Sequence, residues 1–171
     1  FELAHGLPLF GCFPTPAPLR VMLAQFEIAP ESFKPRYTTY VDVMGESPNL
    51  WVASDRTFRI DNDNHLRQLL EEVTTFRPDL FIIDPLYYMH DQPENGDGMK
   101  EVCRRIDLLT PTCAVLVAHH MSKPLVTNAG VVSRGRNDIR GHSILLGWPD
   151  GIVEMRRSPI ADGAMRFTYT F

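Results

Sequence analysis

Two short apolar runs, each followed by polar residues, constrain the fold of this chain more than any other feature. Residues 79–84 read DLFIID and residues 113–120 read CAVLVAHH. Runs of four or five hydrophobic residues at strand length are typical of strands buried on both faces, as in a parallel α/β sheet. Such sheets carry their functional groups just beyond the carboxyl ends of the strands, where Asp84, His119 and His120 would lie.

The rest of the chain alternates in the same manner. Apolar residues recur at helical spacing in three segments, and two more segments have the composition of buried strands. Helices are therefore expected from Pro30 onward, over residues 61–76 with Asp61 or Asp63 as N-cap, and over residues 97–109; strands are expected over residues 20–27 and 49–54. This alternation predicts an α/β fold in which helices flank a mostly parallel sheet.

Both ends of the chain and one long stretch are expected to depart from this pattern. Residues 1–6 read as the last turn of a helix, and residues 7–18 are too rich in proline and glycine for regular structure. Residues 121–141 are expected to be a long loop. The last two strands, over residues 151–157 and 164–171, are expected to form an antiparallel hairpin at the sheet edge.

Composition limits the class of protein. The 171 residues, 44% of them hydrophobic, suit a single domain. A formal net charge of −4 argues against nucleic-acid binding through overall basicity, and leaves a local basic segment for that role. No apolar run approaches the roughly 20 residues that cross a bilayer, so no membrane association is expected. Three widely spaced cysteines, an odd number, are typical of reduced thiols in a cytoplasmic protein.

Two carboxylates are candidates for chemistry at the strand ends. Asp84 follows a run of hydrophobic residues and is suited to hold the water shell of Mg²⁺ beside a triphosphate. Glu27 closes the strand expected next to it, where it would polarise an attacking water as a general base. The alternatives are an aspartate that caps the next loop and an exposed carboxylate at a strand end.

A pair of histidines ends the second apolar run. An imidazole of His119 or His120 would hydrogen-bond a γ-phosphate oxygen and report its loss to the following loop, which begins near Lys123. Adjacent strand residues point to opposite faces, so only one of the two would reach the site. Alternatively, one histidine packs in the core and the other is solvated.

A protein-held metal cluster is a weaker alternative for the same region. Its ligands would come from Asp84, His90, Asp91, His119 and His120, but their spacing lacks the i,i+4 or His-x-His pattern of ordinary zinc sites.

The stretch over residues 121–141 contains four basic side chains. It holds Lys123, Arg134, Arg136 and Arg140. A guanidinium at the end of this stretch, Arg140, would stabilise developing phosphate charge across a subunit interface. The alternative is a surface arginine.

Four motifs in this order resemble a known family. The strand to Glu27 (VMLAQFE), LFIIDPLYYMH from Leu80, VLVAHHMSK from Val115 and RGHSILLGWPDGIVEMRR from Arg140 are similar to segments of RecA-like ATPases of the RepA type. These are the hexameric replicative helicases of plasmids, phages and mobile elements. The similarity extends over essentially the whole chain.

The resemblance implies a role for each candidate residue. Glu27 would be the catalytic base, Asp84 the Walker B residue that holds Mg²⁺ through water, and His119 or His120 the γ-phosphate sensor. Arg140 would be the arginine finger offered to the adjacent subunit, and Lys123 would lie near the nucleotide. Single-stranded DNA would contact the stretch that carries Lys123, Arg134 and Arg136. The implied cofactors are ATP and Mg²⁺, and the implied assembly is a homo-oligomeric ring, a hexamer.

One departure from the family pattern is large. The phosphate-binding motif GxxxxGK[ST] does not occur in these 171 residues, whose first glycines are Gly6 and Gly11. In the family this motif precedes the helix that would end at Gly6. We therefore expect a strand, the phosphate loop and most of a helix, roughly 30 residues, upstream of Phe1. Without them this chain would be inactive by itself.

Two other functions stay open. A non-catalytic adaptor with a RecA-like fold would bind DNA or protein and truly lack the phosphate loop. A recombination or defence ATPase on the same fold would have the same residues.

Overall fold

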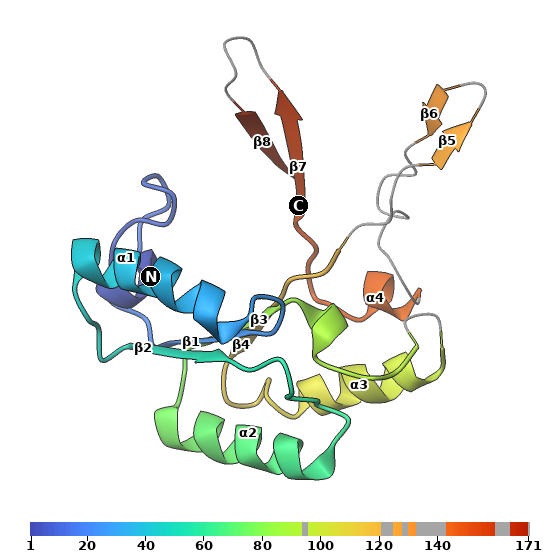
Figure 1. Ribbon diagram of the computed structural model, residues 1–171, viewed down its shortest axis with the longest axis horizontal. Helices are drawn as coiled ribbons and strands as arrows, with labels where there is room; N and C mark the ends of the chain where they lie inside the picture. The colour runs from blue at the N-terminus through green and yellow to red at the C-terminus, as the bar shows by residue number, and fades with distance from the viewer. Residues whose placement is uncertain (94–95, 121–124, 128–129, 133–142, 160–164, 171) are drawn as a thin grey trace. The chain divides into compact units, whose positions relative to one another are not determined.

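Four parallel strands form the central sheet in the computed structural model of the chain (Figure 1). They are β1 (Val21–Gln25), β2 (Leu50–Ser54), β3 (Leu80–Asp84) and β4 (Ala114–Val117), and their order across the sheet is β2-β1-β3-β4. Each neighbouring pair is parallel. The predicted α/β class and parallel sheet are confirmed, whereas a RecA-like core stays a prediction.

The structure describes residues 1–93, 96–120, 125–127, 130–132, 143–159 and 165–170. They divide into two compact units, Phe1–His120 and Met121–Phe171. The prediction that residues 1–171 form a single domain stays a prediction.

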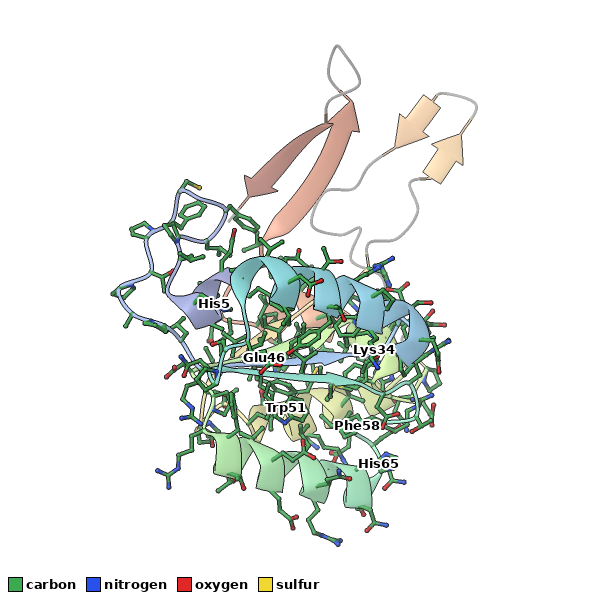
Figure 2. The ribbon with its side chains drawn as sticks, turned by 60° about the vertical axis from the view of Figure 1, so that its left-hand side comes forward. His5, Lys34, Glu46, Trp51, Phe58 and His65 are labelled. Carbon is green, nitrogen blue, oxygen red and sulfur yellow. The ribbon has the colours of Figure 1, made fainter. Side chains whose placement is uncertain are left out.

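Helices lie on both faces of the sheet. The longer ones are α1 (Pro30–Met44), α2 (Asp63–Phe76) and α3 (Gly98–Asp107). Figures 1 and 2 show α1 on one face and α2 on the opposite face. Arg105 of α3 forms an ion pair with Asp63 at the start of α2, 2.8 Å apart, so α3 lies beside α2.

The most deeply buried side chains lie on the side of α2 and α3. Met22 of β1 and Phe81 of β3 are paired in register and fully buried. Trp51, the other register partner of Met22, points toward α2 (Figure 2). Burial of apolar area on this side is the main stabilising contribution to the unit. By contrast, α1 has no fully buried residue.

The start of α2 differs from the sequence prediction. The N-cap is Asn62, whose side chain accepts hydrogen bonds from the backbone N–H groups of Asn64 (2.9 Å) and His65 (3.3 Å). Asp61 instead accepts from the backbone N–H of Asp91 at 3.1 Å. Neither Asp61 nor Asp63 is therefore the N-cap. The Asp61 carboxylate instead binds a residue distant in the sequence, and Asp63 pairs with Arg105.

A 3₁₀ turn precedes the sheet. It is η1 (Glu2–His5), and it ends at Gly6, which has the left-handed φ of 70° and donates its backbone N–H to Leu3. The predicted end of a helical turn at Gly6 is confirmed, although the turn is 3₁₀. A second 3₁₀ turn, η2 (Leu86–Tyr88), follows β3.

The second unit contains two small antiparallel pairs and one short helix. They are β5 (Leu125–Thr127) with β6 (Gly130–Val132), α4 (Ile144–Gly147), and β7 (Glu154–Pro159) with β8 (Met165–Thr170). The prediction of a plain loop over residues 121–141 is therefore wrong at β5 and β6. In the described residues β7 and β8 form their own two-stranded sheet and do not extend the parallel sheet. The residues between these two strands lie outside the described part.

None of the helices in the described ranges has both the length and the apolar character needed to cross a membrane.

Candidate functional site

The strand order places the candidate residues at one edge of the sheet. β3 lies between β1 and β4, and all three run in the same direction. Asp84 is the last residue of β3, whereas Glu27 lies two residues beyond the end of β1. His119 and His120 lie two and three residues beyond the end of β4. The carboxyl edge of the sheet therefore carries both carboxylates and the histidine pair.

Backbone hydrogen bonds hold these ends together beyond the regular pairing. The N–H of Phe26 donates to the carbonyl of Asp84 at 2.8 Å, which ties the residue before Glu27 to β3. On the other side, Ala118 donates to Ile83 at 2.8 Å and Leu86 donates to Ala118 at 2.9 Å. The segments that follow β1 and β4 are thus fixed against the same residues of β3.

The electrostatics of Asp84 show that the groups interact. Partial burial of the carboxyl group raises its pKa, and the negative charge of Glu27 raises it further. The positive charge that His120 acquires on protonation acts in the opposite direction. The shared carboxyl edge of the sheet and the backbone bonds to β3 place the carboxylates and the imidazole in one region, and the direction of this pKa shift agrees with that placement. We call Glu27, Asp84 and His120 the edge cluster.

The edge cluster is accessible from solvent. Glu27, Asp84 and His120 are exposed, whereas His119 is half-buried. Of the two histidines, His120 is the one whose charge acts on Asp84. Two adjacent carboxylates with a nearby imidazole are suited to hold a hydrated cation, to accept a proton from water and to hydrogen-bond an anionic oxygen.

The weaker prediction of a protein-held metal cluster receives no support. In the described ranges no group of three or more His, Cys, Asp or Glu side chains is arranged to hold a metal ion. Asp91 instead pairs with Arg59 at 2.7 Å, and His90 is buried. The five predicted ligands therefore do not assemble.

The three cysteines are free thiols, as expected. Burial and the nearby charge of Asp107 raise the pKa of Cys103 to about 11, and burial also raises the pKa of Cys113. Both buried thiols are therefore poor nucleophiles at neutral pH.

The predicted basic residues lie outside the described part of the chain. These are Lys123, Arg134, Arg136 and Arg140. Their predicted contacts with nucleotide and DNA stay predictions.

A shallow hollow lies away from the edge cluster. It is lined by Arg20, Trp51, Glu72, Thr75 and Phe76. Arg20 directly precedes β1, and its guanidinium lies 4.7 Å from the centre of the Phe76 ring. The hollow is therefore beside the amino ends of the strands, at the opposite edge of the sheet from Asp84 and Glu27. Its open, aromatic lining does not suit a triphosphate.

Two residues near Glu27 were not singled out from the sequence. Gln25, the last residue of β1, is 3% exposed, and its side chain hydrogen-bonds Ser54 at 2.6 Å. The sequence feature that could have identified them is the polar amide of Gln25 at the end of an otherwise apolar strand. A buried amide needs hydrogen-bond partners, so a polar residue such as Ser54 is expected near it.

Comparison with known proteins identifies a family but no individual relative. No curated protein matches the chain. A family model described as the AAA domain matches residues 1–125, which include the whole edge cluster. This family supports an ATPase or nucleotide-binding character and a P-loop NTPase type of function. Since the match extends over more than half of the sequence, the chain belongs to the AAA domain family.

Proposed function

We propose that this chain provides the water-activating and phosphate-sensing groups of a RepA-type ATPase, which couples ATP hydrolysis to binding of, or movement on, single-stranded DNA. The observation that supports it most is the edge cluster, in which Glu27, Asp84 and His120 lie together at the carboxyl edge of a parallel sheet. This edge is where open α/β sheets bind their ligands.

Each member of the edge cluster has a distinct role in the proposal. Glu27 orients and polarises the attacking water. Asp84 would hold Mg²⁺ by accepting hydrogen bonds from the waters bound to the ion. His120, or its neighbour His119, hydrogen-bonds the γ-phosphate and responds to its loss.

The edge cluster has the ligand chemistry that Mg²⁺ prefers. Mg²⁺ keeps several waters in its coordination shell, and the exposed carboxylate of Asp84 can accept hydrogen bonds from such waters. Bound Mg²⁺ would neutralise charge that develops on the phosphates. It would also relieve the repulsion from Glu27 that raises the pKa of Asp84.

The distribution of charge along the sequence favours a polyanionic partner for the second unit. Residues 121–171 contain seven Lys and Arg against four Asp and Glu, a formal charge of +3. Residues 1–120 contain ten against seventeen, a formal charge of −7. Such asymmetry is typical of nucleic-acid binding by one segment of an acidic protein. We propose that Lys123, Arg134 and Arg136 contact single-stranded DNA.

Nucleotide bound between subunits would complete the site. Arg140 would then reach the nucleotide of the neighbouring subunit in a ring, a hexamer, and Lys123 would lie near the phosphates of its own. An arginine supplied across an interface stabilises the charge of the phosphoryl-transfer transition state.

Glu27→Gln is the sharpest test of this function. In the complete protein, the substitution removes the proton acceptor but keeps the size of the side chain. ATP hydrolysis is expected to fall by about 10²–10⁴-fold, with ATP affinity retained, as measured by steady-state turnover and by nucleotide titration. Glu31→Gln, on the exposed first turn of α1, is the matched control and should hydrolyse ATP normally. Normal turnover of Glu27→Gln would end the general-base assignment.

The adaptor is the second candidate function. The coding sequence upstream of Phe1 separates the two candidates. A GK[ST] motif there supports the ATPase, whereas a start codon immediately before Phe1 supports the adaptor. Strand-displacement and strand-exchange assays on the complete protein separate a helicase from a recombination ATPase.

A further inference from the structure

The side chain at the end of β1 forms a closed hydrogen-bond network. Gln25 Oε1 accepts from the backbone N–H of Ile28 at 2.7 Å. Gln25 Nε2 donates to the carbonyl of Ile28 and to Ser54 Oγ. Ser54 Oγ in turn donates to the same carbonyl at 3.3 Å. Both N–H groups of the amide, its oxygen and the serine hydroxyl are thereby satisfied in a buried position, as buried polar groups require.

This network fixes one side of Glu27. Gln25 and Ile28 flank the dipeptide Phe26-Glu27, so the amide side chain holds the far end of this short segment by both backbone groups of Ile28. Ser54, the last residue of the neighbouring strand β2, ties the same point to the sheet.

The other side of Glu27 is fixed independently. Phe26 donates its backbone N–H to the backbone carbonyl of Asp84, and Phe26 itself is 3% exposed. Its ring stacks on Phe58 with centroids 5.5 Å apart, and Phe58 stacks on His65 at the same distance. Figure 2 shows Phe58 close to His65, which lies in the first turn of α2. Glu27 is therefore an exposed side chain on a backbone that is held on both sides.

We propose that Gln25, together with Ser54, is a positioning residue that holds the Glu27 carboxylate beside Asp84. This inference rests on the proposed function of Glu27. A general base must stay within hydrogen-bond reach of the water it activates, and a displacement of about 1 Å can reduce a rate by about 10²-fold. A flexible glutamate on an unanchored loop would lose this geometry.

Gln25→Met tests the catalytic consequence, because methionine keeps the size of the side chain and removes all its strong hydrogen bonds. In the complete protein, kcat for ATP hydrolysis is expected to fall by about 10–100-fold, with KM for ATP changed less than about twofold. In the Glu27→Gln background the same substitution should have no further effect on the residual single-turnover rate, since Gln25 acts through Glu27. Gln68→Met, at an exposed position of α2, is the matched control.

Amide hydrogen exchange tests the network itself, without nucleotide. In this chain the N–H of Ile28 should exchange slowly, and Gln25→Met should make it exchange at the rate of an open loop while Val21–Ala24 stay protected. Ser54→Ala removes one bond to Gln25 and one to Ile28, and provides a milder variant if Gln25→Met does not fold. It should lower kcat by about 2–5-fold in the same non-additive manner.

Three results would overturn the inference. The first is rapid exchange of Ile28 in the unaltered chain. The second is kcat loss in Gln25→Met that multiplies with the loss in Glu27→Gln, which would indicate a merely structural role. The third is unchanged kcat. Normal turnover in Glu27→Gln would instead refute the general-base role of Glu27, and with it the catalytic role of Gln25. Slow exchange of the Ile28 N–H would in that case still show that the hydrogen-bond network exists.

Discussion

Asp84 is held in an electrostatically unfavourable state in the folded chain. Partial burial raises its pKa above the ordinary value of 3.8, and the charge of Glu27 adds to this effect. Since the folded state binds this proton more tightly than the unfolded state, the ionised carboxylate destabilises the fold at pH values above its folded pKa. The destabilisation is relieved as the pH falls through that pKa toward 3.8. Functional sites commonly retain such destabilising groups.

Asp84→Asn should therefore stabilise the protein while it removes the proposed Mg²⁺ ligand. Because the group is exposed and partly screened, the expected increase in Tm at pH 7 is small, about 1–2 °C, and it should shrink as the pH approaches 4. Thermal unfolding followed by circular dichroism measures this shift. Asp42→Asn, on the exposed surface of α1, controls for the loss of one negative charge. A lower Tm in Asp84→Asn than in Asp42→Asn would mean that Asp84 contributes favourably to the fold.

At the scale of single elements, helix α2 depends on a cap that its sequence leaves ambiguous. The three residues Asp61, Asn62 and Asp63 are all good N-cap types. Tertiary contacts decide among them: Asp61 accepts from Asp91, and Asp63 pairs with Arg105 of α3. Asn62 is left to accept from the first free N–H groups of the helix.

Asn62→Ala should lower the free energy of unfolding by about 1 kcal/mol, because two backbone N–H groups lose their acceptor. Urea unfolding measured by fluorescence or circular dichroism gives this change. Asn64→Ala is the matched control, since Asn64 contributes its backbone N–H, which alanine retains. Equal destabilisation by the two substitutions would mean that the Asn62 side chain does not cap α2.

The helices and buried strands were predictable because their signals are local. LFIID and AVLV are apolar over their whole length, and α2 and α3 repeat their apolar residues every three to four positions. The adjacency of β1 and β3 was predicted and is confirmed, whereas the place of β2 on the other side of β1 was not predicted, because it depends on contacts across the sheet. Similarly, β5 and β6 have three residues each, too few to show a period. The edge cluster was predicted by residue type, but its support from Gln25 and Ser54 depends on a side chain reaching across two strands.

At the scale of the whole molecule, opposite charges separate along the sequence. The −7 of residues 1–120 includes the carboxylates of the edge cluster, whereas the +3 of residues 121–171 includes every predicted DNA contact. An acidic protein as a whole repels a polyanion, so binding of DNA must come from a local basic segment. This division makes a salt-dependence experiment informative, since local and overall charge effects respond to different substitutions.

Replacement of Arg134 and Arg136 by alanine should weaken binding of single-stranded DNA and flatten its dependence on salt. Each lost phosphate contact reduces the slope of log K against log salt by about 0.7 for a single strand, so the double variant should lose about 1.4. Titration of a fluorescent oligothymidylate at several salt concentrations measures this slope. Arg56→Ala with Arg67→Ala removes the same charge from exposed positions in residues 1–120, and should leave the slope unchanged. If both double variants flatten the slope equally, binding responds to net charge alone and the basic segment makes no specific contact with phosphate.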